Sequence, residues 1–473
     1  MKTFTGTPAA TTAAEFAPAA APVSQSQTQA AHTTDPQVAA ALFAAWSGDR
    51  FVSIASPPGA GKTRLITHLA EQLHRRAGLK VAVAAQTRAQ ALDVANRAAA
   101  VCASPSTSPS TASTPAAGTS DEPALVADPA ADPVVALLGK GKLRPAGLSL
   151  DAAHIASDKL RGRHGIRPGI VVSTTKRWHW TDTATWSADV LLIDEAWQLT
   201  WADLLALGPL APQIVCVGDP GQISPVVTGS TQRWQSWGAG PHTPAPDALV
   251  SVYGDEVTRQ RLPRTWRLGP ATTALLQPIF YPTLPFTSAR PDRWLSVPDG
   301  TPDGARLPEL RAVAVATSGG HHDPALPAAA AAQVRELLRC TTHDTERDTE
   351  AGSSTGRTLT ARDVAVITPH VAQTAAVAAH LADLPEVLVS TANAAQGLER
   401  EAVVVLHPLA GYRTTPDFAT DPGRLCVALS RHRCHATVIY DPATADVLDR
   451  ARREDPHNDT LAAHVQVLDA LRP

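Results

Sequence analysis

The stretch Ser56-Pro57-Pro58-Gly59-Ala60-Gly61-Lys62-Thr63 decides the fold, because it has the residue pattern of a phosphate-binding loop. A β-prone run over 51–56 leads into it, and the residues that follow have helical spacing. Gly59 and Gly61 let backbone N–H groups approach a phosphate, Lys62 can reach its outer oxygens, and the Thr63 hydroxyl can ligate Mg²⁺. Such loops usually begin with glycine, where this chain has serine. We predict a nucleoside triphosphate site, against the alternative of a glycine turn that binds nothing.

Composition limits the class of protein. A length of 473 residues predicts two or three domains, and a formal charge of −3 excludes a strongly basic surface, so a nucleic-acid partner would need a local groove. The five cysteines include no C-x-x-C pair, which argues against a disulfide framework or a zinc module. No apolar run approaches the roughly 20 residues of a membrane helix, and the N-terminus lacks an apolar signal core. We expect a soluble, cytoplasmic protein without a membrane partner.

Biased segments divide the chain. Residues 1–34 contain few large apolar side chains, which predicts a disordered tail. A Ser/Thr/Pro/Ala-rich stretch at about 103–134 predicts a surface insertion, and a charged stretch at about 341–358 predicts a linker-like insertion without a fold of its own. We expect residues 451–473 to form a C-terminal helical tail.

Between these segments, short β-branched runs alternate with helical stretches, which is typical of an α/β fold with mostly parallel sheets covered by helices. We predict a first domain over 35–240 and a second over 241–450, with the break in the Gly/Pro-rich segment near 238–246. The predicted strands are 51–56, 80–86, 169–175, 189–193 and 213–217 in the first half, and 249–253, 311–316, 363–368, 386–390, 401–406 and 435–440 in the second.

Two acids follow a buried strand over 190–193. Because ligands of open α/β sheets sit at the carboxyl ends of strands, Asp194 is a candidate Mg²⁺ ligand, and Glu195 is a candidate base that orients and deprotonates the attacking water. Strands often end at solvated acids, but the phosphate loop upstream favours the catalytic interpretation.

Six segments match known sequence boxes in order along the chain. Two lie in the first half: Asp194-Glu195-Ala196-Trp197-Gln198 resembles a D-E-A-x-Q box, and Gly218-Asp219-Pro220-Gly221-Gln222 resembles a G-D-x-x-Q box. In the second half, 262–267 resembles L-x-x-Q-Y-R with Thr265 in place of Gln, and 424–431 resembles R-L-N-V-A-L-T-R with Cys426 in place of Asn. Residues 366–373 and 390–399 resemble the V-I-T-P-Y-x-x-Q and Q-G-x-E segments. As a set, these motifs resemble those of superfamily 1B helicases of the up-frameshift-like branch.

The resemblance implies two tandem RecA-like P-loop domains and an ATP-hydrolysing helicase. It also implies roles: Gln37 reads the adenine edge, Trp266 stacks on adenine, and Gln222 senses the γ-phosphate. Arg267 and Arg431 would be arginine fingers, although a salt bridge to a surface acid is the alternative for each. The resemblance further places Gly397 and Glu399 along the nucleotide.

Contacts to a nucleic-acid strand are expected at two strand ends. Thr87 and Arg88 follow one strand, and Thr174 and Thr175 follow another, where hydroxyls beside N–H groups can position a sugar-phosphate chain. The alternative for each threonine is a helix cap. Five tryptophans near the acid box could stack on bases, but core packing is the expected role for most of them: Trp178, Trp180, Trp186, Trp197 and Trp201. The run 321–323, His-His-Asp, is expected to be a loop and not a metal site.

The motifs together predict an ATP-dependent motor that uses Mg²⁺, translocates on single-stranded DNA or RNA and unwinds duplexes, with 5′-to-3′ polarity implied by the resemblance. Protein partners from a repair, mobile-element or phage-defence system would be natural. The alternative is a nucleotide-dependent clamp or switch that grips a strand or a protein without separating a duplex. A P-loop kinase is disfavoured, because it gives no reason for the boxes around Gln396 and Arg431.

Overall fold

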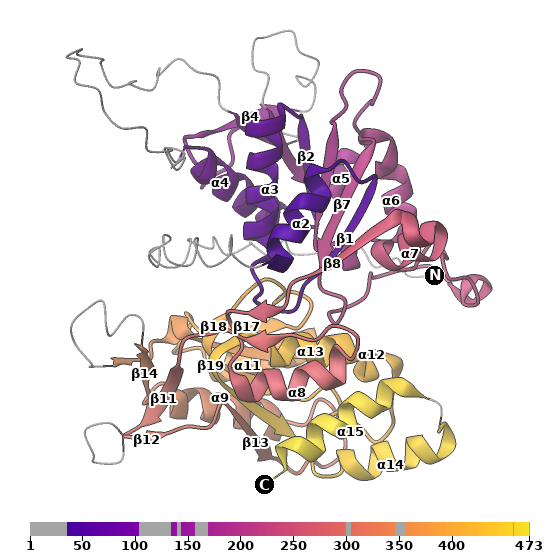
Figure 1. Cartoon of the computed structure of the whole chain (residues 1–473). Helices are drawn as coiled ribbons and strands as arrows, with labels where there is room; N and C mark the ends of the chain where they lie inside the picture. The colour runs from indigo at the N-terminus through magenta and orange to yellow at the C-terminus, as the bar shows by residue number, and fades with distance from the viewer. Residues whose placement is uncertain are drawn as a thin grey trace, which may run out of the picture.

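The chain folds into two lobes, each built on a parallel sheet (Figure 1). The computed structural model describes residues 36–103, 134–139, 143–156, 169–298, 304–345, 356–456 and 458–472. The predicted disordered tail and nearly all of the insertion predicted at about 103–134 lie outside the described residues. The predicted class, an α/β fold with mostly parallel sheets covered by helices, is confirmed.

The first lobe contains an eight-stranded sheet in the order β4-β3-β5-β2-β6-β7-β1-β8, in which every pair of neighbours is parallel. Its strands are β1 Phe51–Ala55, β2 Val81–Ala85, β3 Val135–Gly139, β4 Ala152–Ala156, β5 Ile170–Thr174, β6 Val190–Asp194, β7 Gln213–Gly218 and β8 Val257–Arg261. The helices of this lobe are α2 Pro36–Trp46, α3 Lys62–Ala77, α4 Arg88–Ala103, α5 Thr175–Trp178, α6 Trp201–Leu207 and α7 Ala245–Tyr253.

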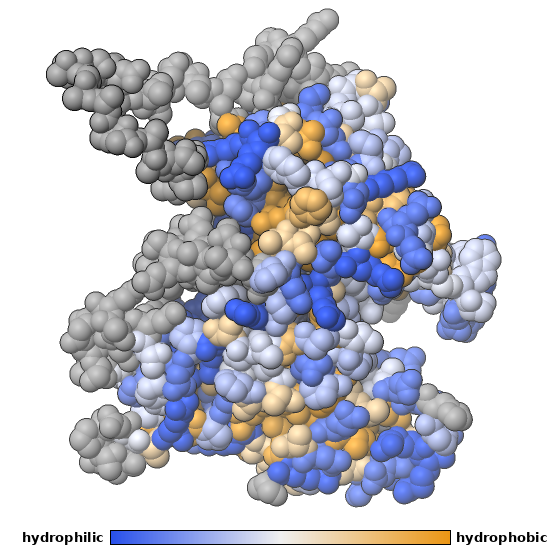
Figure 2. Space-filling model, in the orientation of Figure 1, coloured by the Kyte–Doolittle hydropathy of each residue, from blue (hydrophilic) through white to orange (hydrophobic). Residues whose placement is uncertain are grey.

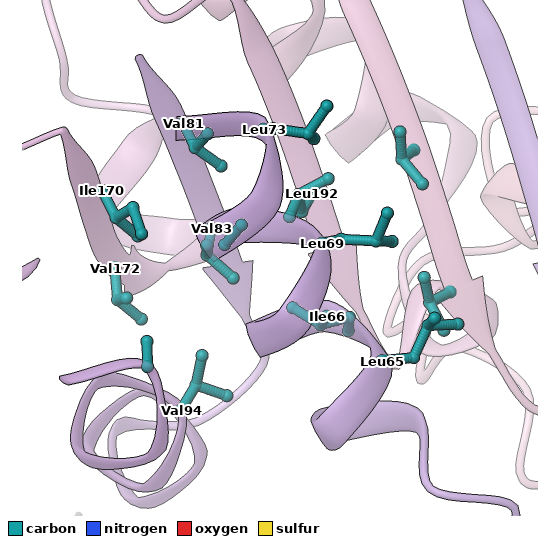
Figure 3. Close-up of a cluster of buried hydrophobic side chains, with 14 of the residues drawn as sticks. Leu65, Ile66, Leu69, Leu73, Val81, Val83, Val94, Ile170, Val172 and Leu192 are labelled. Atoms are coloured by element: carbon teal, nitrogen blue, oxygen red, sulfur yellow. The ribbon is translucent and has the colours of Figure 1, made fainter. Parts of the chain in front are cut away.

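Both faces of this sheet are buried, as parallel sheets require. On β2, Val81 and Val83 pack toward α3 and α4, whereas Ala82 and Ala84 belong to the cluster on the opposite face with α6 and α7. Figure 3 shows the apolar face of α3 lying over the strands, with these labelled side chains directed toward one another: Leu65, Ile66, Leu69, Leu73, Val81, Val83, Val94, Ile170, Val172 and Leu192. This packing holds the N-terminus of α3 at the carboxyl edge of the sheet.

The second lobe contains a five-stranded parallel sheet in the order β13-β19-β18-β16-β17. Its strands are β13 Leu310–Ala314, β16 Val364–Thr368, β17 Leu388–Thr391, β18 Arg400–Leu406 and β19 His432–Tyr440. The core clusters place α9 and α11 on one face and α8, α13 and α15 on the other. The helices are α8 Pro270–Phe280, α9 Ala325–Leu337, α11 Val371–His380, α12 Asp417–Thr420, α13 Pro422–Leu429, α14 Thr444–Glu454 and α15 Asp459–Leu471.

Two small sheets accompany the second lobe. A parallel pair joins β9 Arg264–Thr265 to β10 Thr287–Ser288, and an antiparallel sheet has the order β12-β11-β14-β15. The strands of the antiparallel sheet are β11 Arg293–Val297, β12 Ala305–Arg306, β14 Thr341–Asp344 and β15 Arg357–Thr358. The prediction of an insertion without a fold of its own at about 341–358 is therefore wrong for the two ends of that segment, which form paired strands. The centre of the segment lies outside the described residues.

Three sequence predictions about the first lobe need correction. The strand predicted over 249–253 is part of helix α7, because Pro246 and Asp247 favour a helix start and the apolar residues bury one helical face. The chain leaves the first sheet at Arg261 and not near 238–246, since β8 follows α7 and pairs with β1. The strands β3 and β4 are absent from the predicted set; they extend the sheet at the edge opposite β8.

The C-terminal residues are helical, as predicted, but they pack against the second lobe and do not form a tail. α15 contacts α8, α13 and α14, and it buries the apolar side chains of Leu461, Val467 and Leu468. α15 also buries His464, whose Nδ1 lies 3.4 Å from Nε2 of the fully buried His407. The second lobe thus depends on residues beyond 450 for its core.

On the face shown in Figure 2, hydrophilic residues gather along the line where the two lobes meet, and hydrophobic residues lie over the middle of both lobes. Among the described residues, no helix is both long enough and apolar enough to cross a membrane.

We predict that acid destabilises the second lobe through its buried histidines. Burial lowers the pKa of His464 and of His435 to about 4, and it holds the pKa of His407 well below its usual value. The unfolded chain therefore binds more protons, so stability is retained above about pH 6.5 and lost as pH falls toward about 4, by roughly 1.4 kcal/mol per pH unit and group. Urea unfolding across this range measures the slope.

The matched variants are His464→Gln, which should reduce the slope, and His322→Gln, which removes an exposed histidine and should leave it unchanged. A free energy of unfolding that stays constant between about pH 6.5 and 4 would contradict this account.

Candidate active site at the junction of the lobes

The loop between β1 and α3 has the backbone geometry of an anion cradle. The Ser56 N–H donates to the Gly218 carbonyl at 2.8 Å, which joins the loop to the end of β7. Gly59 and Gly61 have φ angles of 74° and 88°, in the left-handed region that favours glycine. Helix α3 begins after Gly61 with no capping side chain and no acid in its first turn. Its first N–H groups and positive dipole end are therefore suited to a phosphate.

A segment of the second half of the chain lies directly on this loop. The Thr265 hydroxyl donates to the Pro58 carbonyl at 2.7 Å, and the Trp266 N–H donates to the Gly59 carbonyl at 3.0 Å. A Cβ on Gly59 would lie 2.3 Å from Cβ of Arg267. The structure therefore brings two of the predicted site residues, Trp266 and Arg267, to the cradle.

Lys62 lies between two carboxylates at the cradle. Its Nζ is 3.9 Å from Oε1 of Glu195 and 3.7 Å from Oδ2 of Asp219. Asp219 is buried and also accepts hydrogen bonds from Gln222 Nε2 at 2.6 Å and from the Tyr281 hydroxyl at 2.8 Å. One carboxylate thus joins the phosphate-loop lysine, the predicted γ-phosphate sensor and the residue that follows helix α8.

Glu195 has a strained backbone. Among the described residues it is the one non-glycine residue with positive φ, at 52°. Such conformations occur where the surrounding structure enforces them, often at functional sites. This geometry supports the predicted role of Glu195 as the catalytic base, which stays a prediction.

The residues beside Glu195 fit a Mg²⁺ ion. Burial and then the Glu195 carboxylate raise the pKa of the buried Asp194, so a cation there would stabilise its charged form. Asp194 and the Thr63 hydroxyl at the start of α3 supply oxygen ligands, which Mg²⁺ prefers together with phosphate and water. The described residues contain no group of three or more His, Cys, Asp or Glu arranged to hold a metal.

The two predicted arginine fingers differ in their partners. Arg431 is 2% exposed; its Nε donates to the Val427 carbonyl at 3.0 Å and its Nη2 to the Ser430 hydroxyl at 2.8 Å. Its Nη1 is buried without a hydrogen-bond partner among the described residues. Burial, and then the charge of Arg267, lower the pKa of Arg431 to about 10. A buried cationic nitrogen of this kind is suited to an anion brought by a ligand.

Arg267 forms a salt bridge with Glu399, and Arg433 pairs with the same carboxylate. Burial alone would raise the pKa of Glu399, but the two arginines hold it well below its usual value. The salt-bridge alternative therefore describes Arg267 in this structure. Glu399, the acid in this salt bridge, is itself a predicted site residue, and Arg267 connects it to the site. Gly397, in the preceding turn, has φ 77°, and a Cβ on it would meet no neighbouring atom within 4 Å.

Gln37 lies in the first turn of α2, which packs against β1, β8 and α3. The helix therefore stands on the same side of the sheet as the cradle. The adenine-reading role of Gln37 and the stacking role of Trp266 stay predictions.

A polar cleft of about 230 Å³ crosses the junction of the lobes. Buried Nε2 atoms of Gln198 and Gln396 have no hydrogen-bond partner among the described residues, so the cleft offers amide donors to a ligand. The lining residues are Gln86, Thr175, Lys176, Gln198, Thr200, Asp203, Ile223, Ser224, Pro225, Val226, Asn393 and Gln396.

The four residues predicted to contact a nucleic-acid strand have different surroundings in the structure. Thr175 lines the cleft. Thr174 caps α5 by accepting from the Arg177 N–H, and Thr87 caps α4 in a reciprocal pair with Gln90, so the cap alternative describes both. Arg88 is exposed at the first residue of α4.

Several residues of the site escape sequence reasoning. Asp219 belongs to the G-D-x-x-Q box, but the motif does not indicate its position beside Lys62. Tyr281 and Thr265 reach the site through tertiary contacts, and no local pattern marks Tyr281. Lys176 follows Thr175 directly, and its charge next to that candidate is a signal that the sequence does offer.

Comparisons with known proteins agree with the division of the chain into two lobes. Residues 39–228 match one protein-family model of an AAA domain, and residues 329–443 match a second model of an AAA domain. The two matches fall in different lobes, the first contains the phosphate loop, and together they indicate a P-loop NTPase. A search of curated proteins found no match.

Solved structures similar to this chain include the PRRSV helicase, with 16% identity and a TM-score of 0.39 over 85% of this chain and 54% of that one. Arterivirus nonstructural protein 10, a helicase, matches with 16% identity and a TM-score of 0.39, covering 85% of this chain and 61% of that one. The structure of this helicase in complex with DNA matches with 16% identity and a TM-score of 0.40, covering 85% of this chain and 63% of that one. This chain therefore spans less than two thirds of these helicases.

We predict that Gly59→Ala disrupts the junction and nucleotide binding. The new methyl group would meet Arg267 at 2.3 Å, and the positive φ adds roughly 1–2 kcal/mol of strain. Thermal unfolding and binding of a fluorescent ATP analogue measure both effects. Gly78→Ala is the control, because Gly78 has φ 68° and open space around it, so it should lose stability but keep nucleotide affinity. Equal affinity in the two variants would contradict the close contact.

Proposed function

We propose that this protein is a superfamily 1 motor that hydrolyses ATP to translocate along single-stranded nucleic acid and separate duplexes. The observation that carries the proposal is the composite site. Its phosphate cradle belongs to the first lobe, and it is contacted by Thr265 and Trp266 and accompanied by the buried Arg431 from the second. The two AAA-domain matches support the nucleotide chemistry.

The residues of the site suit phosphoryl transfer to water. Lys62, held between two carboxylates in this structure, would turn to the outer phosphate oxygens when ATP occupies the cradle. Glu195 would then be released to orient and deprotonate water. Bound Mg²⁺, held by Thr63 and Asp194, would neutralise charge on the phosphates.

The second lobe would supply stabilisation of the transition state. The unpartnered Nη1 of Arg431 is a donor for the transferred phosphoryl group. From the first lobe, Gln222 has a buried Oε1 without a partner among the described residues, so this oxygen can accept a hydrogen bond from the attacking water. Arg267 would have to leave Glu399 to reach the same charge.

We propose that a single strand binds in the cleft across the junction of the lobes. The cleft is lined by both lobes, with Thr175 and Lys176 from the first and Asn393 and Gln396 from the second. Because the nucleotide is also bound between the lobes, a change in nucleotide state would change their separation and shift a bound strand. Hydroxyl, amide and ammonium groups hold a sugar-phosphate chain without reading its sequence.

Further details of the proposal come from the sequence resemblance. We propose membership of the up-frameshift-like branch, 5′-to-3′ polarity and a cytoplasmic location. Strand type, DNA or RNA, is left to experiment, and protein partners from a repair, mobile-element or defence system remain a proposal.

The direct test measures ATP hydrolysis with and without single-stranded DNA and RNA, followed by displacement from a duplex with a 5′ or a 3′ tail. Stimulation by a strand together with displacement from the 5′-tailed duplex supports the motor. Stimulation without displacement of either duplex would leave the clamp or switch in its place. No stimulation by any strand would refute the nucleic-acid motor.

We predict that Glu195→Gln retains ATP binding and loses turnover by at least about 100-fold, because the amide keeps the shape but cannot take a proton. Single-turnover hydrolysis and binding of a fluorescent ATP analogue measure the two properties separately. Asp189→Asn, which removes an acid before the same strand, is the control and should retain turnover. Normal turnover in Glu195→Gln would reject Glu195 as the base.

We predict that Arg431→Lys lowers kcat by about 1,000-fold with a smaller change in KM, since lysine has a single nitrogen and cannot occupy the positions of both Nη1 and Nη2. Steady-state hydrolysis measures both constants. Arg433→Lys is the matched control, because Arg433 pairs with Glu399 and Glu401 and is assigned no contact with the nucleotide. Equal kinetics in the two variants would remove Arg431 from the site.

A further inference from the structure

A tyrosine of the second lobe reaches into the first lobe. Tyr281 follows α8 and is 2% exposed, and its hydroxyl donates to Oδ1 of the buried Asp219 at 2.8 Å. The ring lies against the loop that follows β7, because a Cβ on Gly221 would come within 2.5 Å of it. Phe286 contacts the ring edge to face, with centroids 5.3 Å apart. Packing therefore fixes the hydroxyl against the Asp219 carboxylate.

The Asp219 carboxylate is surrounded by donors. Its Oδ1 also accepts from the Gly221 N–H at 3.1 Å, and its Oδ2 accepts from Nε2 of Gln222 at 2.6 Å. The same Oδ2 lies 3.7 Å from Nζ of Lys62. Burial raises the pKa of Asp219, whereas the charge of Lys62 and the hydrogen bond from Tyr281 lower it. An ionised carboxylate only accepts hydrogen bonds, so Gln222 has to turn its NH₂ group toward Asp219.

This requirement decides which atom of the Gln222 amide is available to a ligand. Because Nε2 is bound to Asp219, Oε1 points elsewhere, and it is buried without a partner among the described residues. The backbone of Gln222 is also held, since a Cβ on Gly423 would lie 2.7 Å from its carbonyl oxygen. Water has two hydrogens, so Oε1 can accept one while the proposed base, Glu195, takes the other. An amide turned the other way would offer donors instead.

Cys426 orients the Tyr281 hydroxyl. The Sγ of Cys426 lies 3.2 Å from the tyrosine oxygen. Tyr281 has one hydroxyl proton and gives it to Asp219, so the thiol is the donor in this contact. Burial raises the pKa of Cys426 well above its usual value, and the thiol therefore keeps its proton near pH 7. Cys426 stands where the motif R-L-N-V-A-L-T-R has Asn, and both side chains can donate.

We propose that Tyr281 and Cys426 are positioning residues that set the orientation of the Gln222 amide for hydrolysis. The thiol donates to the tyrosine, and the tyrosine and the Gln222 amide nitrogen both donate to Asp219, which leaves Oε1 for the attacking water. Tyr281 and Cys426 belong to the second lobe, and Gln222 belongs to the first, so the orientation depends on contact between the lobes. The inference rests on the proposed function and deepens it, because it assigns a part in hydrolysis to residues that act through Gln222.

The test measures steady-state ATP hydrolysis without a strand for the wild type, Tyr281→Phe, Gln222→Ala and the double variant. Tyr281→Phe keeps the ring and removes the hydroxyl, so it should lower kcat about 10-fold and change KM by less than about 2-fold. In the Gln222→Ala background the same substitution should lower kcat by less than about 2-fold, because the residue through which it acts is absent. Equal 10-fold losses in both backgrounds would overturn the inference in favour of a purely structural role.

Cys426 provides a second, independent measurement. Cys426→Ala removes the donor and should lower kcat about 3-fold, and Cys426→Ser supplies a donor again and should restore it. Tyr412→Phe is the matched control, because it removes a second-lobe hydroxyl that lies 2.7 Å from Nε2 of His370, and it should keep the wild-type kcat. Thermal unfolding checks that each variant is folded.

The outcomes separate this inference from the proposed function. Wild-type kcat in Tyr281→Phe would overturn the inference and leave ATP hydrolysis in place. Equal kcat values in Cys426→Ala and Cys426→Ser would remove Cys426 from the series of hydrogen bonds. If the wild type hydrolyses ATP but no DNA or RNA strand stimulates it, the motor falls and the inference stands. If the wild type hydrolyses no ATP, with or without a strand, both fall.

Discussion

The contact between the phosphate loop and the segment around Thr265 is the constraint on which the rest of the site depends. Two carbonyls of the loop accept hydrogen bonds from Thr265 and Trp266, and Gly59 leaves no room for a side chain against Arg267. Because the loop is anchored to β1 and the segment leads into α8, the two lobes meet at the place where a nucleotide would bind. The site therefore cannot change without changing the junction.

Asp219 extends this coupling through charge. It follows the end of β7, and its Oδ2 lies 3.7 Å from Nζ of Lys62. It also accepts a hydrogen bond from the hydroxyl of Tyr281, which follows α8. Burial raises the pKa of Asp219, while Lys62 and Tyr281 act in the opposite direction. A nucleotide that attracts Lys62 would remove one of these stabilising partners. Occupancy of the cradle would therefore affect the second lobe through the Asp219 carboxylate.

Much of the fold and the site could be predicted from sequence, because parallel strands end at one edge of a sheet. Lys62, Glu195 and Gln222 each follow a strand, so local patterns place them together. Local patterns could not distinguish helix α7 from a strand, since a short apolar run suits both. They also could not find the Tyr281–Asp219 contact, which depends on how α8 packs, or the exposure of Trp180 among four packed tryptophans. Thr87 and Thr174 show the opposite kind of error: they were predicted to contact a nucleic-acid strand, but in the structure they cap helices.

We propose that one composite site converts nucleotide state into relative movement of the lobes. The most direct measurement is the distance distribution between spin labels on the exposed positions Ala89 of α4 and Ala332 of α9, one in each lobe. We expect the distribution to shift when Mg²⁺ and a non-hydrolysable ATP analogue are added, and to return when the nucleotide is removed. An unchanged distribution at saturating nucleotide would contradict it.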